Sequence, residues 1–262
     1  MSTVRTDDDA GVRLLTLDRP SALNAFNAAL FDDLTDAVLA ATGDDTVRVL
    51  VLTGAGRAFS AGADLKRMGE PSTGARHGLN GLLEALIDFP KPILLAINGL
   101  GVGIGATIVG LVDVAVIADD ARLRAPFSAL GLTAEAASTC TFPRLMGHQW
   151  ASWFLMSGEW LTAEQCVASG LAIESCPTDE VLARTMERAR ALAALPLDSL
   201  TATKELIVGP QRQSRKAAVA AENEALARLL GGPANREAIA AFREKRPVDF
   251  TALDRAGTSE AG

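Results

Sequence analysis

The sequence has few of the residues on which most metal and nucleophile chemistries depend. It contains three cysteines, at positions 140, 166 and 176, and two histidines, His77 and His148. Neither a C-x-x-C pair nor an H-E-x-x-H motif occurs, so no metal site is predicted. The phosphate-binding motif G-x-x-x-x-G-K-S/T and the esterase motif G-x-S-x-G are also missing. Any chemistry must therefore rest on carboxylates and on backbone dipoles.

Positive charge is scarce as well. The chain has 25 Lys and Arg residues against 32 Asp and Glu residues, a net charge of -7, so a broad attraction to nucleic acid or to an anionic membrane is not expected. The first residues contain no apolar stretch of the kind that a secretory signal needs, and three widely spaced cysteines form no disulfide framework. We therefore expect a cytoplasmic protein with neither a nucleic-acid nor a membrane partner.

The apolar pattern predicts an α/β fold. A chain of 262 residues, 48% of them hydrophobic, is long enough for one large domain or two modest ones. Nearly continuous apolar runs predict strands covered on both faces, and after residue 143 the spacing becomes mostly helical. Strands are expected at 12–17, 48–53, 92–97, 113–118 and 171–175, and helices at 27–41, 144–157, 163–169, 180–194, 199–208, 214–230 and 235–245.

One uncharged segment, residues 93–112, has the length of a membrane span. It contains Asn98 and five glycines, which divide it into an apolar run, an Asn-Gly turn signal and a short stretch of small residues. We therefore expect a buried strand, a turn and a helix instead of a span.

The same segment also fits the dinucleotide-binding pattern G-x-G-x-x-G/A at Gly101, Gly103 and Ala106. A dinucleotide-binding crossover requires about a dozen residues or more between its two strands. Only residues 107–112 separate Ala106 from the next predicted strand, so a dinucleotide site is not expected.

Two turns of small residues, 60–65 and 101–105, each follow a predicted strand and precede a short apolar stretch. Backbone N–H groups at helix starts have no partner within the helix. If the two turns converge, their N–H groups form an oxyanion hole that a substrate can approach closely. The alternative is that the small residues only permit tight packing of a strand against a helix.

Four stretches together resemble the crotonase, or enoyl-CoA hydratase/isomerase, superfamily over nearly the whole chain. They are residues 19–25 (RPSALNA), 58–65 (AFSAGADL), 91–99 (KPILLAING) and 242–247 (FREKRP). The resemblance implies a spiral of β-β-α units with a C-terminal helical region, divided into a core domain at 1–195 and a trimerisation region at 196–262. It also implies a homotrimer or hexamer that binds an acyl-CoA thioester, with coenzyme A as part of the substrate and no separate cofactor.

The resemblance assigns roles to individual residues. The N–H groups of Ala63 and Ile104 would bind the thioester oxygen. Phe242 and Lys245 would reach the CoA of a neighbouring subunit, although a lysine in such a run is also typical of a solvated surface. The remaining CoA contacts would be Ala22, Leu23, Ala61, Asp64 and Leu65.

The acidic residues indicate the reaction. The two positions that carry the carboxylates of a hydratase match Thr107 and Phe127, and neither side chain can transfer a proton at neutral pH. Residues 126–135 and 141–147 resemble the peroxisomal-type Δ3,Δ2-enoyl-CoA isomerases of fatty acid metabolism, whose single catalytic glutamate matches Glu135. The glycine that commonly follows this glutamate is Ala136 here.

Other hypotheses about the function of Glu135 and of the chain stay open at this point. Glu135 could serve a hydratase or a thioester hydrolase together with another partner, or the chain could bind acyl-CoA without turnover. A glutamate at this position is also favoured simply by the dipole at a helix start.

Overall fold

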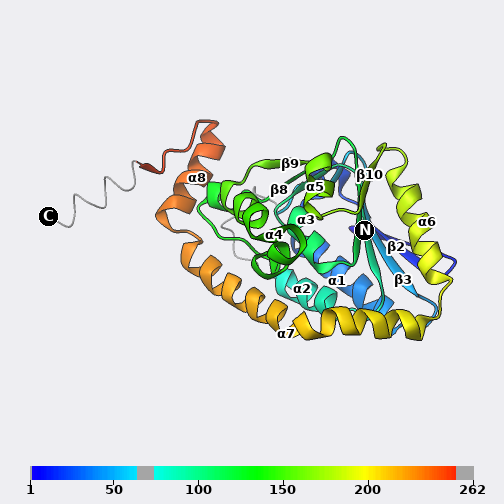
Figure 1. Ribbon diagram of the computed structural model, residues 1–262. Helices are drawn as coiled ribbons and strands as arrows, with labels where there is room; N and C mark the ends of the chain where they lie inside the picture. Colours follow the sequence, from blue (N-terminus) through cyan, green and yellow to red (C-terminus); the bar gives the residue numbers. More distant parts are fainter. Residues whose placement is uncertain (1, 64–73, 252–262) are drawn as a thin grey trace.

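The strands are divided between two sheets in the computed structural model, which describes residues 2–63 and 74–251 (Figure 1). The predicted CoA contacts Asp64 and Leu65 lie outside these ranges. The larger sheet is parallel except for its first strand, and its order is β1 (Val4–Asp9), β2 (Val12–Leu17), β3 (Val49–Gly54), β5 (Ile93–Ile97), β7 (Val114–Ala118) and β10 (Glu174–Cys176). The smaller sheet consists of β4 (Ala58–Ser60), β6 (Leu100–Val102), β8 (Arg122–Arg124) and β9 (Trp160–Thr162).

From β3 to β8, consecutive strands alternate between the two sheets. β3, β5 and β7 pair in the larger sheet, and the strands that follow them, β4, β6 and β8, pair in the smaller one. Helix α2 (Gly78–Asp88) follows the first pair, and α3 (Ile104–Thr107) with the 3-10 turn η3 (Ile108–Leu111) follows the second. The predicted α/β class and the spiral of β-β-α units are therefore confirmed.

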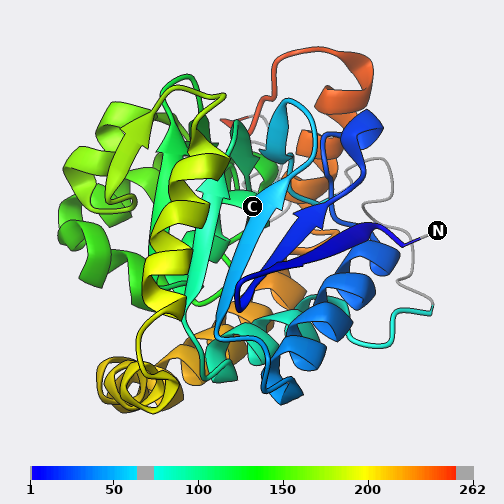
Figure 2. The ribbon, with the colours of Figure 1, turned by 90° about the vertical axis from the view of Figure 1, so that its right-hand side faces the viewer.

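Helices cover both faces of the larger sheet, as its apolar strands require. Side chains alternate along β3: Val49 and Val51 join the cluster that includes Met186 of α6 (Val181–Ala193), whereas Leu50 and Leu52 belong to the main core. Figure 2 shows α6, in yellow, lying across its face of the sheet. On the other face lies α1 (Ala28–Gly43), which begins where Asn27 accepts a hydrogen bond from the N–H of Leu30 at 2.9 Å.

The uncharged segment 93–112 forms β5, β6, α3 and η3 inside the core. The expectation of a strand, a turn and a helix is therefore confirmed. Within residues 2–63 and 74–251, no helix is both long enough and apolar enough to cross a membrane.

The C-terminal half is helical but differs in detail from the prediction. Its helices are α4 (Ser138–Ser157), α5 (Ala163–Ser169), α6, α7 (Leu197–Leu229) and α8 (Pro233–Glu244). The two helices predicted at 199–208 and 214–230 are one helix, α7, that continues through Pro210. Proline removes one N–H donor from a helix, but buried Lys204 and Glu222 lie on either side of it and attach both halves of α7 to the rest of the chain.

Some elements gave no signal in the sequence. β1 exposes all its residues but Val4, and the strands of the smaller sheet have only three residues each, too few for a periodicity.

Figure 1 shows α7 running along one edge of the molecule from α6 to α8, and it packs on α2 and α4. The division of the chain at residue 195 and the trimerisation role of 196–262 stay predictions.

Lys204 is the buried charge that joins α7 to the larger sheet. Its ammonium group donates to the Lys91 carbonyl and to the Asp113 carboxylate, both at 2.8 Å, and only 9% of the residue is exposed. The same Asp113 oxygen accepts the N–H of Ile93 at the start of β5. Removal of the ammonium group would leave the Lys91 carbonyl without this donor and would take the counter-charge from the Asp113 carboxylate.

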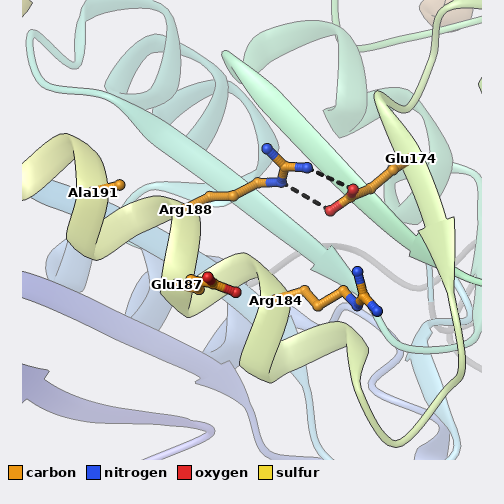
Figure 3. Close-up of a pocket in the computed structure, with 5 residues that line it drawn as sticks. All are labelled: Glu174, Arg184, Glu187, Arg188 and Ala191. Carbon is orange, nitrogen blue, oxygen red and sulfur yellow. Dashed lines mark hydrogen bonds and ion pairs between the residues drawn. The ribbon is translucent and has the colours of Figure 1, made fainter.

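We therefore expect Lys204→Met to lower the free energy of unfolding by about 1 to 3 kcal/mol, measured by urea denaturation. The control is Arg188→Met on α6, whose bidentate ion pair with Glu174 lies in an open surface hollow (Figure 3). Loss of this exposed pair should cost less than about 1 kcal/mol. Equal losses for the two variants would contradict the anchoring role of Lys204.

Candidate active site

Asn24 fixes the turn that carries Ala22 and Leu23, two of the predicted CoA contacts, against the start of the smaller sheet. Its side chain is fully buried and donates to the carbonyls of Ala55 and Ala58 at 2.9 and 2.8 Å. The carbonyl of Asn24 accepts the hydroxyl of Ser60 at 2.8 Å. The turn is therefore held directly beside β4.

Three of the predicted CoA contacts lie together at this junction. The N–H of Ala61 donates to the carbonyl of Leu23 at 2.8 Å, and Ala22 precedes Leu23 at the end of the 3-10 turn η1 (Pro20–Ala22). All three residues are partly exposed. They form a short backbone edge that a ligand can reach.

The two small-residue turns touch each other. Gly62 has φ +82°, and a Cβ atom on it would lie 2.6 Å from the Val102 carbonyl oxygen. A Cβ atom on Gly105 would lie equally close to the Ser60 carbonyl. Gly103 has φ 54° and ψ -123°, a conformation open to glycine almost alone. Glycine is therefore required here for the close approach of the two backbones.

Ala63 and Ile104 are the residues that immediately follow these touching glycines. In the part of the chain that the structure describes, the N–H groups of Ala63 and Ile104 donate to no acceptor. Ile104 is buried and starts α3, whereas Ala63 is exposed. The two turns thus bring a pair of unsatisfied N–H donors to the edge of the core.

Glu135 lies in the loop between the 3-10 turn η4 (Ser128–Leu130) and α4. It is half-buried, and its neighbours Ala134, Ala136 and Ala137 are buried. Burial, together with the negative charge of Glu222, raises the pKa of Glu135 from 4.5 to about 7. The carboxyl group can therefore both accept and release a proton near neutral pH.

The backbone after Glu135 makes an unusual turn. Ala136 and Ala137 both have positive φ, at 62° and 55°, in the left-handed region that glycine prefers. Ser138 closes the turn, because its N–H and its hydroxyl both donate to the Glu135 carbonyl, the hydroxyl at 2.6 Å. The left-handed conformation of Ala136 gives a reason why glycine suits the position after this glutamate.

Helix packing joins the segment that follows Ile104 to the helix that follows Glu135. The helix that begins at Ile104 runs into η3, and η3 packs on the start of α4: a Cβ atom on Gly110 would lie 2.2 Å from the hydroxyl of Thr141. Glu135 comes three residues before α4. The helical segment that begins at Ile104 therefore packs, through η3, on the helix that follows Glu135.

Neither position of the hydratase carboxylates provides an acid. Thr107 is fully buried and its hydroxyl donates to the Gly103 carbonyl at 3.1 Å. Phe127 is buried in the main core.

Two further predicted CoA contacts lie on α8, away from these turns in the chain. Phe242 is 61% exposed, and Lys245 is exposed at the end of the helix. Their contact with the CoA of a neighbouring subunit stays a prediction.

Glu222 was missed in the sequence. It lies on α7 and accepts hydrogen bonds from Ala137 and Thr139, next to Glu135. Nothing local distinguishes it from the exposed glutamates of the same helix, such as Glu205 and Glu224.

Comparisons with known proteins agree with this architecture. The model of the family "Enoyl-CoA hydratase/isomerase" matches residues 7–253. A crystal structure of an enoyl-CoA hydratase/isomerase from Pseudoalteromonas atlantica superposes with a TM-score of 0.90 at 31% identity, over 95% of this chain and 99% of that one.

Curated relatives carry the names of both reactions. Enoyl-CoA delta isomerase 2 of Rattus norvegicus is 36% identical over 82% of this chain, which spans only 56% of the rat protein's length. The 2,3-dehydroadipyl-CoA hydratase of Escherichia coli is 35% identical over 95% of this chain and 99% of its own length.

The match of the family model over nearly the whole chain, the full-length relatives and the two-sheet spiral lead to one conclusion. The chain belongs to the enoyl-CoA hydratase/isomerase family of the crotonase superfamily.

Proposed function

We propose that this protein is a Δ3,Δ2-enoyl-CoA isomerase of fatty acid metabolism, which moves the double bond of a 3-enoyl-CoA to the 2-position. The observation that carries the proposal is a single proton-transfer group: Glu135 has a pKa raised to about 7, while Thr107 and Phe127 occupy the hydratase positions. Isomerisation needs one base, whereas hydration in this family uses two carboxylates.

In the proposed reaction the Glu135 carboxylate removes a proton from C2 of the substrate. The electron pair moves through the thioester carbonyl to give a dienolate, whose oxygen accepts hydrogen bonds from the N–H groups of Ala63 and Ile104. The protonated Glu135 then returns the proton at C4, which leaves the double bond between C2 and C3. A pKa near 7 suits a group that must act first as base and then as acid.

The acyl-CoA would lie along the backbone edge formed by Ala22, Leu23 and Ala61. Asp64 and Leu65 would continue this edge, and Phe242 and Lys245 of a neighbouring subunit in a homotrimer or hexamer would complete the CoA site. The N–H groups of Ala22, Leu23 and Ala61 already donate within the chain, so the C=O groups of this edge would accept hydrogen bonds from the nucleotide without a strongly basic surface.

Hydration of a 2-enoyl-CoA is the second candidate, because the E. coli relative named as a hydratase is matched over 99% of its length. It would require a second proton-transfer group beside Glu135. Glu222 already accepts three hydrogen bonds from Ala137 and Thr139, which favours isomerisation. Formation of 3-hydroxyacyl-CoA by the purified protein would support hydration instead, and tight binding of CoA esters without any turnover would indicate a non-catalytic member.

Glu135→Gln should lower kcat for 3-enoyl-CoA by about 10² to 10⁴-fold while leaving CoA-ester binding intact, since the amide keeps the shape but not the base. The assay is a panel of 2-enoyl, 3-enoyl and saturated acyl-CoAs of several chain lengths. Glu187→Gln, at an exposed position on α6, is the control and should keep wild-type activity. Full activity of Glu135→Gln would refute the assignment of the base.

The rate should also depend on pH. Because Glu135 must be ionised to remove the proton, kcat/KM for 3-enoyl-CoA should fall as the pH drops through about 7. The measurement is a pH profile of kcat/KM with a correction for protein stability. If kcat/KM instead fell only around pH 4.5, the ordinary pKa of glutamate, Glu135 would not be the base with the raised pKa that the proposal requires.

The proposed oxyanion hole depends on the contact between its two turns. Gly62→Ala would place a methyl group against the Val102 carbonyl at a positive φ. We expect a loss of about 1 to 3 kcal/mol of stability and a fall in kcat of about 10 to 10²-fold, because small displacements of the donors are costly. Gly43→Ala at the end of α1, where an added Cβ meets no atom within 4 Å, should leave both quantities nearly unchanged. The account would be wrong if the two variants behaved alike.

A further inference from the structure

Glu222 is a buried acid that the proposed reaction does not use. It lies on α7, 87 residues after Glu135 in the sequence, and only 5% of it is exposed. One carboxylate oxygen accepts the N–H of Ala137 at 2.7 Å. The other accepts the N–H and the hydroxyl of Thr139 at 3.0 and 2.6 Å. Three donors on one short segment thus converge on a single carboxylate.

These hydrogen bonds supply the cap of α4. The residue at the helix start, Ala137, has no side chain that could accept the free N–H groups of the first turn. Glu222 accepts two of them from another helix, where a negative charge is also favoured by the helix dipole. Helix α4 therefore begins at a point fixed by α7.

The same hydrogen bonds restrain the backbone that carries Glu135. Ala136 and Ala137 lie in the left-handed region, which alanine adopts only at a cost of about 1 to 2 kcal/mol per residue. Glu222 holds the N–H of Ala137, while Ser138 holds the carbonyl of Glu135. The turn is thus fixed on the side that follows Glu135.

Asn235 of α8 fixes the other side of the loop. Its amide donates to the carbonyl of Leu130 at 2.8 Å, and it is almost fully buried. Both C-terminal helices therefore hold the loop of Glu135 in place.

Glu222 is also the charge that acts on Glu135. Among the described residues, no other charged group contributes to the electrostatic environment of Glu135. Several other charged side chains on the helices packed here have partners elsewhere: Arg144 donates to the Cys140 carbonyl, Lys216 pairs with Asp88, Glu224 pairs with Arg228, and Glu237 pairs with Arg246. Arg215 of α7 is different, because its buried Nε has no hydrogen-bond partner among the described residues.

We propose that Glu222 is a positioning residue for the isomerisation proposed above: its buried carboxylate sets both the place of Glu135 and the charge that Glu135 faces. The inference rests on that proposed function for its kinetic consequence, whereas its structural part rests on the three hydrogen bonds alone. It also assigns α7 a role in the active site of its own chain.

The first test is Glu222→Gln. The amide nitrogen of glutamine cannot accept a hydrogen bond, so either Ala137 or Thr139 loses its acceptor. The negative charge of residue 222 also disappears. We expect the acid limb of the kcat/KM profile to move to lower pH, because Glu135 ionises more readily without a neighbouring charge. We also expect kcat on the alkaline plateau to fall by about tenfold or more, since the base is held less well.

Glu222→Asp separates charge from position. Aspartate keeps the negative charge but is one methylene shorter, so the carboxylate cannot reach all three donors. The plateau kcat should therefore fall, while the acid limb stays closer to that of the wild type than the limb of Glu222→Gln does. Glu224→Gln, an exposed glutamate on the same helix, is the matched control and should change neither quantity.

A purely structural role predicts a different pattern. It would lower the free energy of unfolding in Glu222→Gln without moving the acid limb of the folded enzyme, and that result would overturn the proposal. An acid limb that moves equally in Glu222→Gln and Glu222→Asp would overturn it too, because charge would then not be the cause.

A substrate-free measurement keeps this test independent of the proposed function. The carboxyl resonance of Glu135 can be titrated in protein labelled with ¹³C-glutamate and assigned with Glu135→Gln. A lower Glu135 pKa in Glu222→Gln supports the inference even if the wild-type protein does not isomerise 3-enoyl-CoA, which would refute only the proposed function. An unchanged Glu135 pKa would refute the role of Glu222 whether or not the enzyme is an isomerase.

Discussion

The site depends on the close approach of two backbone turns, one after β4 and one after β6. Strands β4 and β6 are parallel neighbours in the smaller sheet, so the turns that follow them leave the sheet at the same edge. Gly62 lies directly against Val102, and Gly105 lies against Ser60. A side chain at either glycine would separate the turns, and with them the N–H groups of Ala63 and Ile104. The need for glycine at positions 62 and 105 and the proposed oxyanion hole therefore both follow from the contact between the two turns.

The second part of the candidate site is the carboxyl group of Glu135. It lies in a loop whose conformation is not stabilised by the neighbouring residues in the sequence alone. Glu135 precedes two alanines in the left-handed conformation and a helix without a capping side chain of its own. The missing interactions come from α7 and α8, through Glu222 and Asn235. The C-terminal helices thus hold the loop of Glu135 in their own chain, and the charge of Glu222 adds to the effect of burial, which raises the pKa of Glu135.

Much of the fold was predictable because the larger sheet is covered on both faces, so its strands are nearly continuous apolar runs. The segments at 92–97 and 113–118 were identified on this basis, and they correspond to β5 and β7. The smaller sheet gave no such signal, because three residues cannot establish a period. The interruption predicted between residues 208 and 214 was wrong, because contacts at Lys204 and Glu222 hold α7 together across Pro210.

The candidate site was accessible to prediction only where its proposed chemistry is local in the sequence. The turns around Ala63 and Ile104 and the loop of Glu135 are short motifs, and the resemblance to a known family identified each of them. Glu222 acts across 85 residues of chain on Ala137, and nothing in its own neighbourhood distinguishes a buried glutamate from an exposed one. Long-range hydrogen bonds of this kind follow from the three-dimensional packing alone.

The most direct test of this account is a crystal structure of the protein with a bound acyl-CoA thioester. The account predicts a thioester oxygen at about 2.7 to 3.1 Å from the backbone nitrogens of both Ala63 and Ile104. It also predicts that the Glu135 carboxylate lies beside C2 and C4 of the acyl chain. A thioester oxygen bound elsewhere, or Glu135 directed away from the acyl chain, would contradict it.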